Sequence, residues 1–423
     1  MPLPSLIEIE PPSHSIRATI TVPGSKSITN RALILAALGR GMTTLRGALW
    51  SEDTQVMVHC LQQLGFTIHV ASEPDEYANR TITVVGRGGQ IPRGGTVAEP
   101  LGLYVGNAGT AARFLAALVC LGSGVYRLHG VPRMHERPQI ELFTALRSLG
   151  YRVDSQNGFL PALIYGAGGP RPGRCTVSLA ASSQFASALL LTAPAAGWSV
   201  ATTGAENTEE APYVAMTERL IATFPVGGGE FSVEPDASSG SYFWGANALL
   251  GGGISVKDWP TSGWQIDAEF PRYLPLPTEL SRERQLGDAI MTAITLAPWA
   301  AHPVRFTELG RLRVQECERV AALRTELTKC GAQVCESGDT LTVRPGPLHG
   351  AEIDTYHDHR MAMCFATLGL RVPGLRLRDA ACVKKTFPNF FQKLVAPAPH
   401  GLGVILRDVQ TGRRLENDDL FAA

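Results

Sequence analysis

Apolar, helix-like runs recur along the chain, and each is followed by a small-residue break and a short β-like run that ends near glycine. The clearest copies cover residues 31–66, 113–151 and 290–334, and weaker copies begin at Gln184, Tyr242 and Arg360. Because each copy alternates helix with strand, the pattern predicts an α/β protein. The irregular spacing argues against a solenoid, and six copies over 423 residues fit two domains of three units each.

The first helix of several copies is apolar nearly all round. Runs such as RALILAAL (31–38) and RFLAALVCL (113–121) leave little polar face. A helix without a polar face is buried on every side. We therefore expect helices inside each domain, with the sheets outside them.

Charge and cysteine usage limit the possible functions. Lys plus Arg equals Asp plus Glu at 38 each, and charged residues are 18% of the chain, so no global field favours nucleic acid or an anionic membrane. No basic stretch precedes an apolar run at the N-terminus, and no apolar segment is long enough to span a membrane. The eight cysteines show no CxxC pairing, which is typical of reduced thiols rather than of a zinc site or disulfide framework. The sequence predicts a soluble, cytoplasmic protein.

Donor-rich junctions precede several of the apolar helices. In PGSKSITNRALIL (23–35), hydroxyls, Lys26 and Arg31 accompany the free backbone amides of a helix start, which together make an anion site. An ordinary cap at Thr29 or Asn30 with exposed basic residues explains the same letters. Both readings stay open for this stretch taken alone.

The arrangement recurs in other copies. In YVGNAGTAARF (104–114), glycines that permit close backbone approach lie beside Asn107. Hydroxyls and an amide stand before the helices that follow ASSQF (181–185) and PDASSGSYF (235–243). Each stretch by itself is also typical of a tight turn or cap. Their recurrence favours a shared cleft that faces the helix N-termini.

The last third of the chain combines carboxylates with cations. Asp288 precedes an apolar run, and Glu316 and Arg319 are three residues apart, which predicts one helical face. Arg360 lies at a helix start and Lys385 in the stretch CVKKTFPNFF. Cations bind a polyanion and carboxylates move protons, so this set suits proton transfer on an anionic substrate. Surface ion pairs are the alternative for any single residue.

Six ordered motifs carry a resemblance to a known family. PGSKSITNRALILAAL, GNAGTAAR, PRMHERP, SSQF, DHRMAM and KTFP are similar to those of the 5-enolpyruvylshikimate-3-phosphate synthase family and extend over nearly the whole chain. The related UDP-N-acetylglucosamine enolpyruvyl transferases match less well, because the stretch GSGVYRLHGVPRMHERP lacks their catalytic-loop cysteine.

The resemblance implies a two-domain fold in which each domain has three βαβαββ units with buried helices and outer sheets. One domain would be residues 23–236 and the other residues 1–22 plus 237–423, with the active site in the cleft between them. The implied reaction transfers the enolpyruvyl group of phosphoenolpyruvate to the 5-hydroxyl of shikimate 3-phosphate and releases phosphate. It uses no metal or organic cofactor, and we expect a monomer with small-molecule substrates.

The resemblance also assigns roles to residues. Asp288 would deprotonate the attacking hydroxyl, and Glu316 with Lys26 would protonate the methylene carbon. Phosphoenolpyruvate, a small dense anion, would meet several arginines and lysines; its implied ligands are Lys26, Asn107, Gly109, Arg137, Gln184, Arg319, Arg360 and Lys385. The implied acceptor ligands are Ser27, Arg31, Ser182, Ser183, Gln184, Tyr213 and Asp288.

Two positions depart from the family pattern at the acceptor phosphate. Gln315 stands where the family has a lysine, and Glu210, in EAPY, stands where it has a serine. Each charge change at about 4 Å from a phosphate is worth roughly 4 kcal/mol at an effective dielectric near 20. Arg311, four residues before Gln315, could replace the lysine or pair with Glu210, so these three positions join the predicted acceptor site.

The departures leave alternatives open. Shikimate 3-phosphate is the default acceptor. A divergent enzyme would instead use unphosphorylated shikimate or a similar hydroxylated carboxylate, by enolpyruvyl transfer or by elimination of water. A non-catalytic anion-binding relative is a third possibility, and the intact Asp288, Glu316 and Lys26 argue against it.

Overall fold

The computed structural model describes residues 3–179, 182–204 and 211–420. The described chain forms two compact units. One consists of Met1–Pro23 with Pro235–Ala423, and the other of Gly24–Glu234. We call them the terminal unit and the central unit. Neither the terminal nor the central unit contains, among its described residues, a helix long and apolar enough to cross a membrane.

Three buried helices form the interior of the central unit. They pack against one another and comprise α1 (Lys26–Leu38), α3 (Gly109–Leu118) and α6 (Ser183–Ala196). All ten residues of α3 are buried, as its apolar sequence predicts. Further helices of this unit are α2 (Glu52–Gln63), α4 (Pro132–His135), α5 (Ile140–Ser148) and α7 (Ala211–Thr223).

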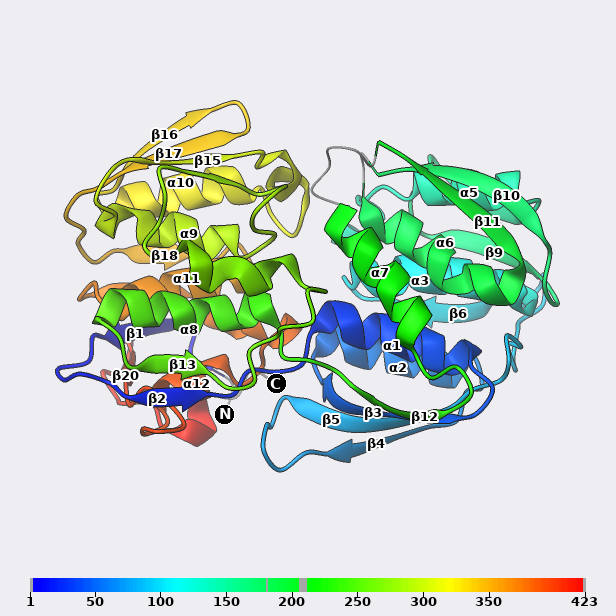
Figure 1. Ribbon diagram of the computed structural model, residues 1–423, viewed down its shortest axis with the longest axis horizontal. Coiled ribbons are helices and arrows are strands. Elements are labelled where there is room, and N and C mark those ends of the chain that lie inside the picture. The colour runs from blue at the N-terminus through cyan, green and yellow to red at the C-terminus, as the bar shows by residue number, and fades with distance from the viewer. Residues whose placement is uncertain (1–2, 180–181, 205–210, 421–423) are drawn as a thin grey trace. The chain divides into compact units, whose positions relative to one another are not determined.

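Sheets cover the helices of the central unit (Figure 1). The sheet β12–β3–β5–β4 comprises Gly229–Ser232, Met42–Leu49, Asn79–Val85 and Ile68–Ser72. The sheet β6–β7–β9–β8 comprises Leu101–Tyr104, Ser123–His129, Ala162–Ala167 and Arg152–Ser155. A parallel pair joins β10 (Gly173–Ser178) to β11 (Trp198–Thr203).

The terminal unit repeats this plan. Its inner helices α8 (Ala237–Leu250), α9 (Ile290–Leu296) and α11 (His359–Gly369) pack together, and Figure 1 shows them between strands. The sheet β14–β15–β17–β16 comprises Glu279–Ser281, Val304–Thr307, Thr340–Arg344 and Gln333–Ser337. The sheet β18–β19–β1–β20 comprises Glu352–Asp354, Leu375–Arg378, Leu6–Glu10 and Ile405–Asp408. This unit also contains β2 (Ala18–Ile20), which pairs with β13 (Ile254–Val256), and the helices α10 (Arg319–Lys329) and α12 (Phe390–Val395).

The four larger sheets share one topology. In each, a parallel pair of strands continues into two antiparallel pairings. Alternating side chains along a strand determine which face of the sheet is buried. In β1, Ile7 and Ile9 are fully buried, while Glu8 between them is not. The repeated sequence pattern therefore corresponds to a repeated sheet topology. This topology places the donor-rich junctions at the starts of the inner helices.

Candidate functional site

In the terminal unit, the predicted charged residues meet at the starts of three helices. Asp288 lies two residues before α9, Arg319 is the first residue of α10, and Arg360 is the second residue of α11. Asp358 caps α11, since its carboxylate accepts from the Arg360 amide at 2.8 Å. Helix starts that converge in this way bring side chains from distant sequence positions together.

Arg319 forms the centre of this cluster and is only 1% exposed. Its Nε lies 2.7 Å from Asp358 Oδ2 and its Nη2 lies 2.8 Å from Glu316 Oε2. Burial by itself would lower the pKa of the guanidinium, but Asp358, Glu316 and Asp288 outweigh it and raise that pKa. Arg319 therefore stays charged in the interior.

Asp288 is surrounded by three arginines. Its Oδ2 lies 2.9 Å from Arg360 Nη2, and its Oδ1 lies 3.1 Å from Arg282 Nη2 and 3.9 Å from Arg319 Nη1. Burial would raise the pKa of this carboxyl, yet Arg360, Arg319 and Arg282 together hold it well below its usual range. Asp288 is thus ionised and held at both oxygens.

Glu316 joins two of the predicted cations. Its Oε1 lies 2.9 Å from Lys385 Nζ, while its Oε2 pairs with Arg319. Glu316 does not share a helical face with Arg319, because α10 begins only at Arg319. The expectation of one helical face is wrong in its geometry, although the two side chains do meet.

Gln315 contacts the cluster directly, because its Oε1 accepts a hydrogen bond from Arg319 Nη1. Arg311, in the 3-10 helix Gly310–Val314, is half-buried and near enough to Arg282 to help lower the pKa of that group. Gln315 and Glu316 therefore belong to the cluster around Arg319. Glu210, the other departure from the family pattern, lies outside the described residues.

The central unit carries a second group of predicted residues around the start of α3. A Cβ atom on Gly109 would lie 2.6 Å from Arg113 Nη1, 2.8 Å from Arg137 Nη2 and 3.1 Å from Gln184 Oε1. Arg137 Nη1 donates to the Asn107 carbonyl at 3.1 Å. Glycine at 109 thus leaves room for two guanidinium groups and an amide beside the free backbone donors of a helix start.

The start of α1 holds Lys26, whose Nζ lies 3.0 Å from Asp53 Oδ2. Helix α1 begins at Lys26 with Ser25 as its N-cap residue, so the alternative of a cap at Thr29 or Asn30 is wrong. The chain turns into the helix several residues earlier than the apolar pattern begins. Lys26 and Ser27 consequently lie in the first turn, where backbone donors are free.

Arg31 is buried in the central unit. Its Nε donates to Thr217 Oγ1 at 2.7 Å, and its Nη2 donates to Ser187 Oγ at 2.9 Å. Its Nη1 donates to the Ser27 carbonyl at 2.9 Å, and its Nη2 also donates to the Tyr213 carbonyl at 3.5 Å. The predicted acceptor ligands Ser27, Arg31 and Tyr213 are therefore neighbours.

Ser182 and Ser183 are buried at the start of α6. Ser182 caps this helix, because its Oγ accepts from the Gln184 amide at 3.2 Å. Gln184 links this start to α3 through its position beside Gly109. The central-unit residues thus form one connected group across the starts of α1, α3 and α6.

The chain is similar to known proteins over most of its length. The family model for EPSP synthase (3-phosphoshikimate 1-carboxyvinyltransferase) matches residues 11–227 and 281–394. The chain belongs to the EPSP synthase family. The 3-phosphoshikimate 1-carboxyvinyltransferase of Nostoc punctiforme is 38% identical over 431 residues, covering 92% of this chain and 98% of the relative. That of Opitutus terrae is 39% identical over 432 residues, covering 93% and 98%.

Solved structures agree on the fold of this EPSP synthase family member. An EPSP synthase from Acinetobacter baumannii has a TM-score of 0.74 at 21% identity and covers 95% of this chain and 99% of its own. The enolpyruvyl transferase NikO from Streptomyces tendae has a TM-score of 0.68 at 16% identity and covers 96% and 99%. The predicted fold class, the α/β enolpyruvyl transferase fold, is confirmed.

Sequence reasoning missed two residues that touch the segment around Asp288. Arg282 lies in SRERQ, which has the composition of a solvated loop. Asp267 is buried, and its Oδ1 accepts from the amides of Gly287 and Ala289 at 2.7 and 3.2 Å. No spacing rule connects either residue to Asp288. Among the described residues, no group of three or more His, Cys, Asp or Glu side chains could hold a metal ion.

Proposed function

We propose that this EPSP synthase family member transfers the enolpyruvyl group of phosphoenolpyruvate to the 5-hydroxyl of shikimate 3-phosphate and releases phosphate. The observation that carries the proposal is the terminal-unit cluster, in which two carboxylates, Asp288 and Glu316, lie among cations that the family resemblance assigns to the donor. The names of relatives that are 37–39% identical over nearly their full length support the same reaction.

The donor would bind through guanidinium and ammonium groups. Phosphoenolpyruvate carries a carboxylate and a phosphate, both of which suit bidentate arginines. We assign it to Arg319, Arg360 and Lys385 of the terminal unit and to Lys26, Asn107, Gly109, Arg137 and Gln184 of the central unit. The proposed substrates therefore need groups from both units. We propose that one domain comprises residues 23–236 and the other residues 1–22 plus 237–423.

The proposed reaction proceeds by addition of the acceptor to the donor, followed by elimination of phosphate. Asp288 takes the proton of the 5-hydroxyl, the hydroxyl oxygen bonds to C2 of the donor, and Glu316 with Lys26 delivers a proton to the methylene carbon. The resulting tetrahedral ketal then loses phosphate, which leaves with the proton held by Asp288, while Glu316 with Lys26 takes back a proton from the new methyl group and the double bond is restored. Asp288 becomes a stronger base when the donor anion binds, because the anion draws Arg319 and Arg360 away from its carboxylate.

The acceptor would bind through Ser27, Arg31, Ser182, Ser183, Gln184 and Tyr213, with Asp288 at the reacting hydroxyl. Arg319 donates a hydrogen bond to Gln315, where the family has a lysine, and Arg311 lies four residues before it. This local positive charge, together with the names of the relatives, supports a phosphorylated acceptor over unphosphorylated shikimate. We further propose that the protein works as a cytoplasmic monomer without a cofactor.

Phosphate release from phosphoenolpyruvate tests the proposal. One reaction contains shikimate 3-phosphate and a second contains shikimate, and mass analysis identifies the products. We expect release with the phosphorylated acceptor and a product heavier by one enolpyruvyl group. Turnover confined to shikimate, or conversion of shikimate without use of phosphoenolpyruvate, would show a changed acceptor. No turnover in either reaction would reject the proposed function.

A further inference from the structure

Arg282 contacts the proposed base from a position that the donor-binding residues do not share. Its side chain is 3% exposed, and its Nη2 lies 3.1 Å from Asp288 Oδ1. Its backbone amide donates to the Thr307 carbonyl at 3.2 Å, which extends the pairing of β14 with β15 by one residue. The outer sheet therefore fixes the base of this side chain, and the guanidinium reaches inward to the carboxylate.

Burial of Arg282 is costly unless its charge has a partner. Desolvation lowers the pKa of the guanidinium to about 10, and Asp288 is the largest influence that opposes this change. An arginine retains its proton at that value under neutral conditions. Since an isolated charge in the interior would cost several kcal/mol per ion, the pair with Asp288 accounts for the presence of Arg282 at this depth.

The three arginines around Asp288 differ in what else they do. Arg319 and Arg360 are assigned to the donor, so donor binding would withdraw them from Asp288. Arg282 is not assigned to either substrate. We propose that Arg282 is a positioning residue that keeps the Asp288 carboxylate in place when Arg319 and Arg360 turn to the donor anion. This inference rests on the proposed function.

The proposal predicts how pH dependence changes. The charged groups that face Asp288 and Arg282 are Arg311, Arg319, Arg360, Glu316 and Asp267. With Arg282 removed, one of three cations that favour the ionised carboxylate is lost, so the pKa of Asp288 rises. The acid limb of the kcat profile should then move to higher pH, by on the order of 1 unit.

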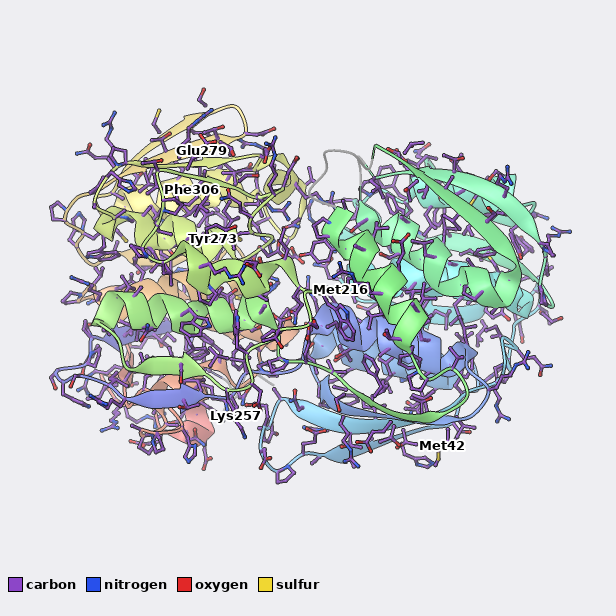
Figure 2. All side chains as sticks on the ribbon, in the orientation of Figure 1. Met42, Met216, Lys257, Tyr273, Glu279 and Phe306 are labelled. Carbon is purple, nitrogen blue, oxygen red and sulfur yellow. The ribbon has the colours of Figure 1, made fainter. Side chains whose placement is uncertain are left out.

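The variants Arg282→Gln and Arg282→Lys test the role. We expect Arg282→Gln to lower kcat about 10- to 100-fold, as misplacement of a catalytic group does, with the KM for phosphoenolpyruvate changed less than about threefold. Arg282→Lys should recover part of the loss, because it keeps a cation. Arg305→Gln is the matched control: Arg305 pairs with Glu279 on the exposed side of the same sheet, where Figure 2 labels Glu279. Its kcat should equal that of the unaltered protein.

A double-variant cycle decides whether Arg282 acts through Asp288. In an Asp288→Asn background, Arg282→Gln should reduce the residual kcat by less than about twofold. An equal loss in both backgrounds would overturn the proposal and indicate a general structural role. A raised KM with unchanged kcat would overturn it as well, since it would make Arg282 a donor ligand.

The urea midpoints of the same four proteins provide a readout that needs no activity. Because the two side chains are paired, we expect the shifts caused by Arg282→Gln and Asp288→Asn to be non-additive. Additive shifts would contradict the pairing. An unaltered protein without turnover would reject the proposed function, whereas additive midpoints would reject the pairing of Arg282 with Asp288, so the two failures are distinguishable.

Discussion

The terminal and central units hold their buried arginines in different ways. In the terminal unit, Arg319 pairs with the carboxylates of Asp358 and Glu316. In the central unit, Arg31 donates to the hydroxyls of Thr217 and Ser187 and to backbone carbonyls. Arg319 thus contacts carboxylates, whereas Arg31 contacts hydroxyl and carbonyl oxygens.

This difference between the two arginines suggests that some substitutions change the reaction rate and others change substrate binding. A carboxylate that is paired with an arginine can be released when a substrate anion takes that arginine, so the terminal unit is suited to proton transfer. Neutral oxygens and a glycine-lined helix start keep donors in fixed positions, as around Gly109 and Arg137. We therefore expect changes around Asp288 in the terminal unit to act mainly on kcat, and changes around Gly109 in the central unit to act mainly on KM.

The largest effect is expected from Asp288→Asn. The amide cannot accept the hydroxyl proton, so kcat should fall about 10²- to 10⁴-fold. Binding of phosphoenolpyruvate should be retained, because the cations around position 288 remain. Phosphate release gives the rate and calorimetry gives the binding. Asp339→Asn is the control, since Asp339 is an exposed carboxylate that pairs with Arg313. A rate above one tenth of the original would show that Asp288 is not the base.

We expect the two buried arginines to contribute different amounts to the free energy of unfolding. Arg319→Met leaves the fully buried Asp358 without its main partner, which should cost about 3–5 kcal/mol of unfolding free energy. Arg31→Met removes the donor to the hydroxyls of Thr217 and Ser187 and to the Ser27 carbonyl, which should cost about 1–3 kcal/mol. Urea unfolding of the two variants, with the transitions of the two units fitted separately, gives both values. Equal losses would remove the distinction between charged and neutral support.

The buried carboxyl of Asp267 makes the stability of the terminal unit depend on pH. Burial, and then the charge of Asp288, raise the pKa of Asp267 to about 6. Between pH 4 and 6 the native protein therefore binds a proton that the unfolded chain has released, so stability from this group falls as pH rises. The loss across the window is on the order of 3 kcal/mol, and Asp267→Asn should abolish it.

Urea midpoints at several pH values measure this effect as the difference between the original protein and Asp267→Asn. Asp419→Asn is a useful comparison, because Arg413 lowers the pKa of the Asp419 carboxyl to about 2. That group contributes stability which is lost only as pH falls below about 4. If the two variants show the same pH dependence between pH 4 and 6, Asp267 is not the group that titrates there.

Sequence periodicity was sufficient for the fold but not for every member of the site. The repeated apolar runs predicted inner helices, and the family resemblance assigned Asp288, Arg319 and Arg360 to the site. Periodicity could not place Arg282 or Asp267, because they reach Asp288 through tertiary packing of loops that read as ordinary polar sequence. The pairing of Glu316 with Arg319 was anticipated for the wrong reason, since a loop rather than a helical face joins them.

The smallest effect, and the one that tests the binding side of the comparison, is expected from Gly109→Ala. The new methyl group would lie 2.6 Å from Arg113 Nη1 and 2.8 Å from Arg137 Nη2, so the ends of both arginine side chains must shift. The fold should tolerate the shift, while the KM for phosphoenolpyruvate should rise about tenfold, or about 1.4 kcal/mol, with a smaller change in kcat. Gly102→Ala is the matched control, because its methyl group would meet nothing nearer than His129 Nε2 at 3.8 Å. A fall in kcat at unchanged KM would mean that the start of α3 acts on the chemical step, and the contrast between Asp288 and Gly109 would fail.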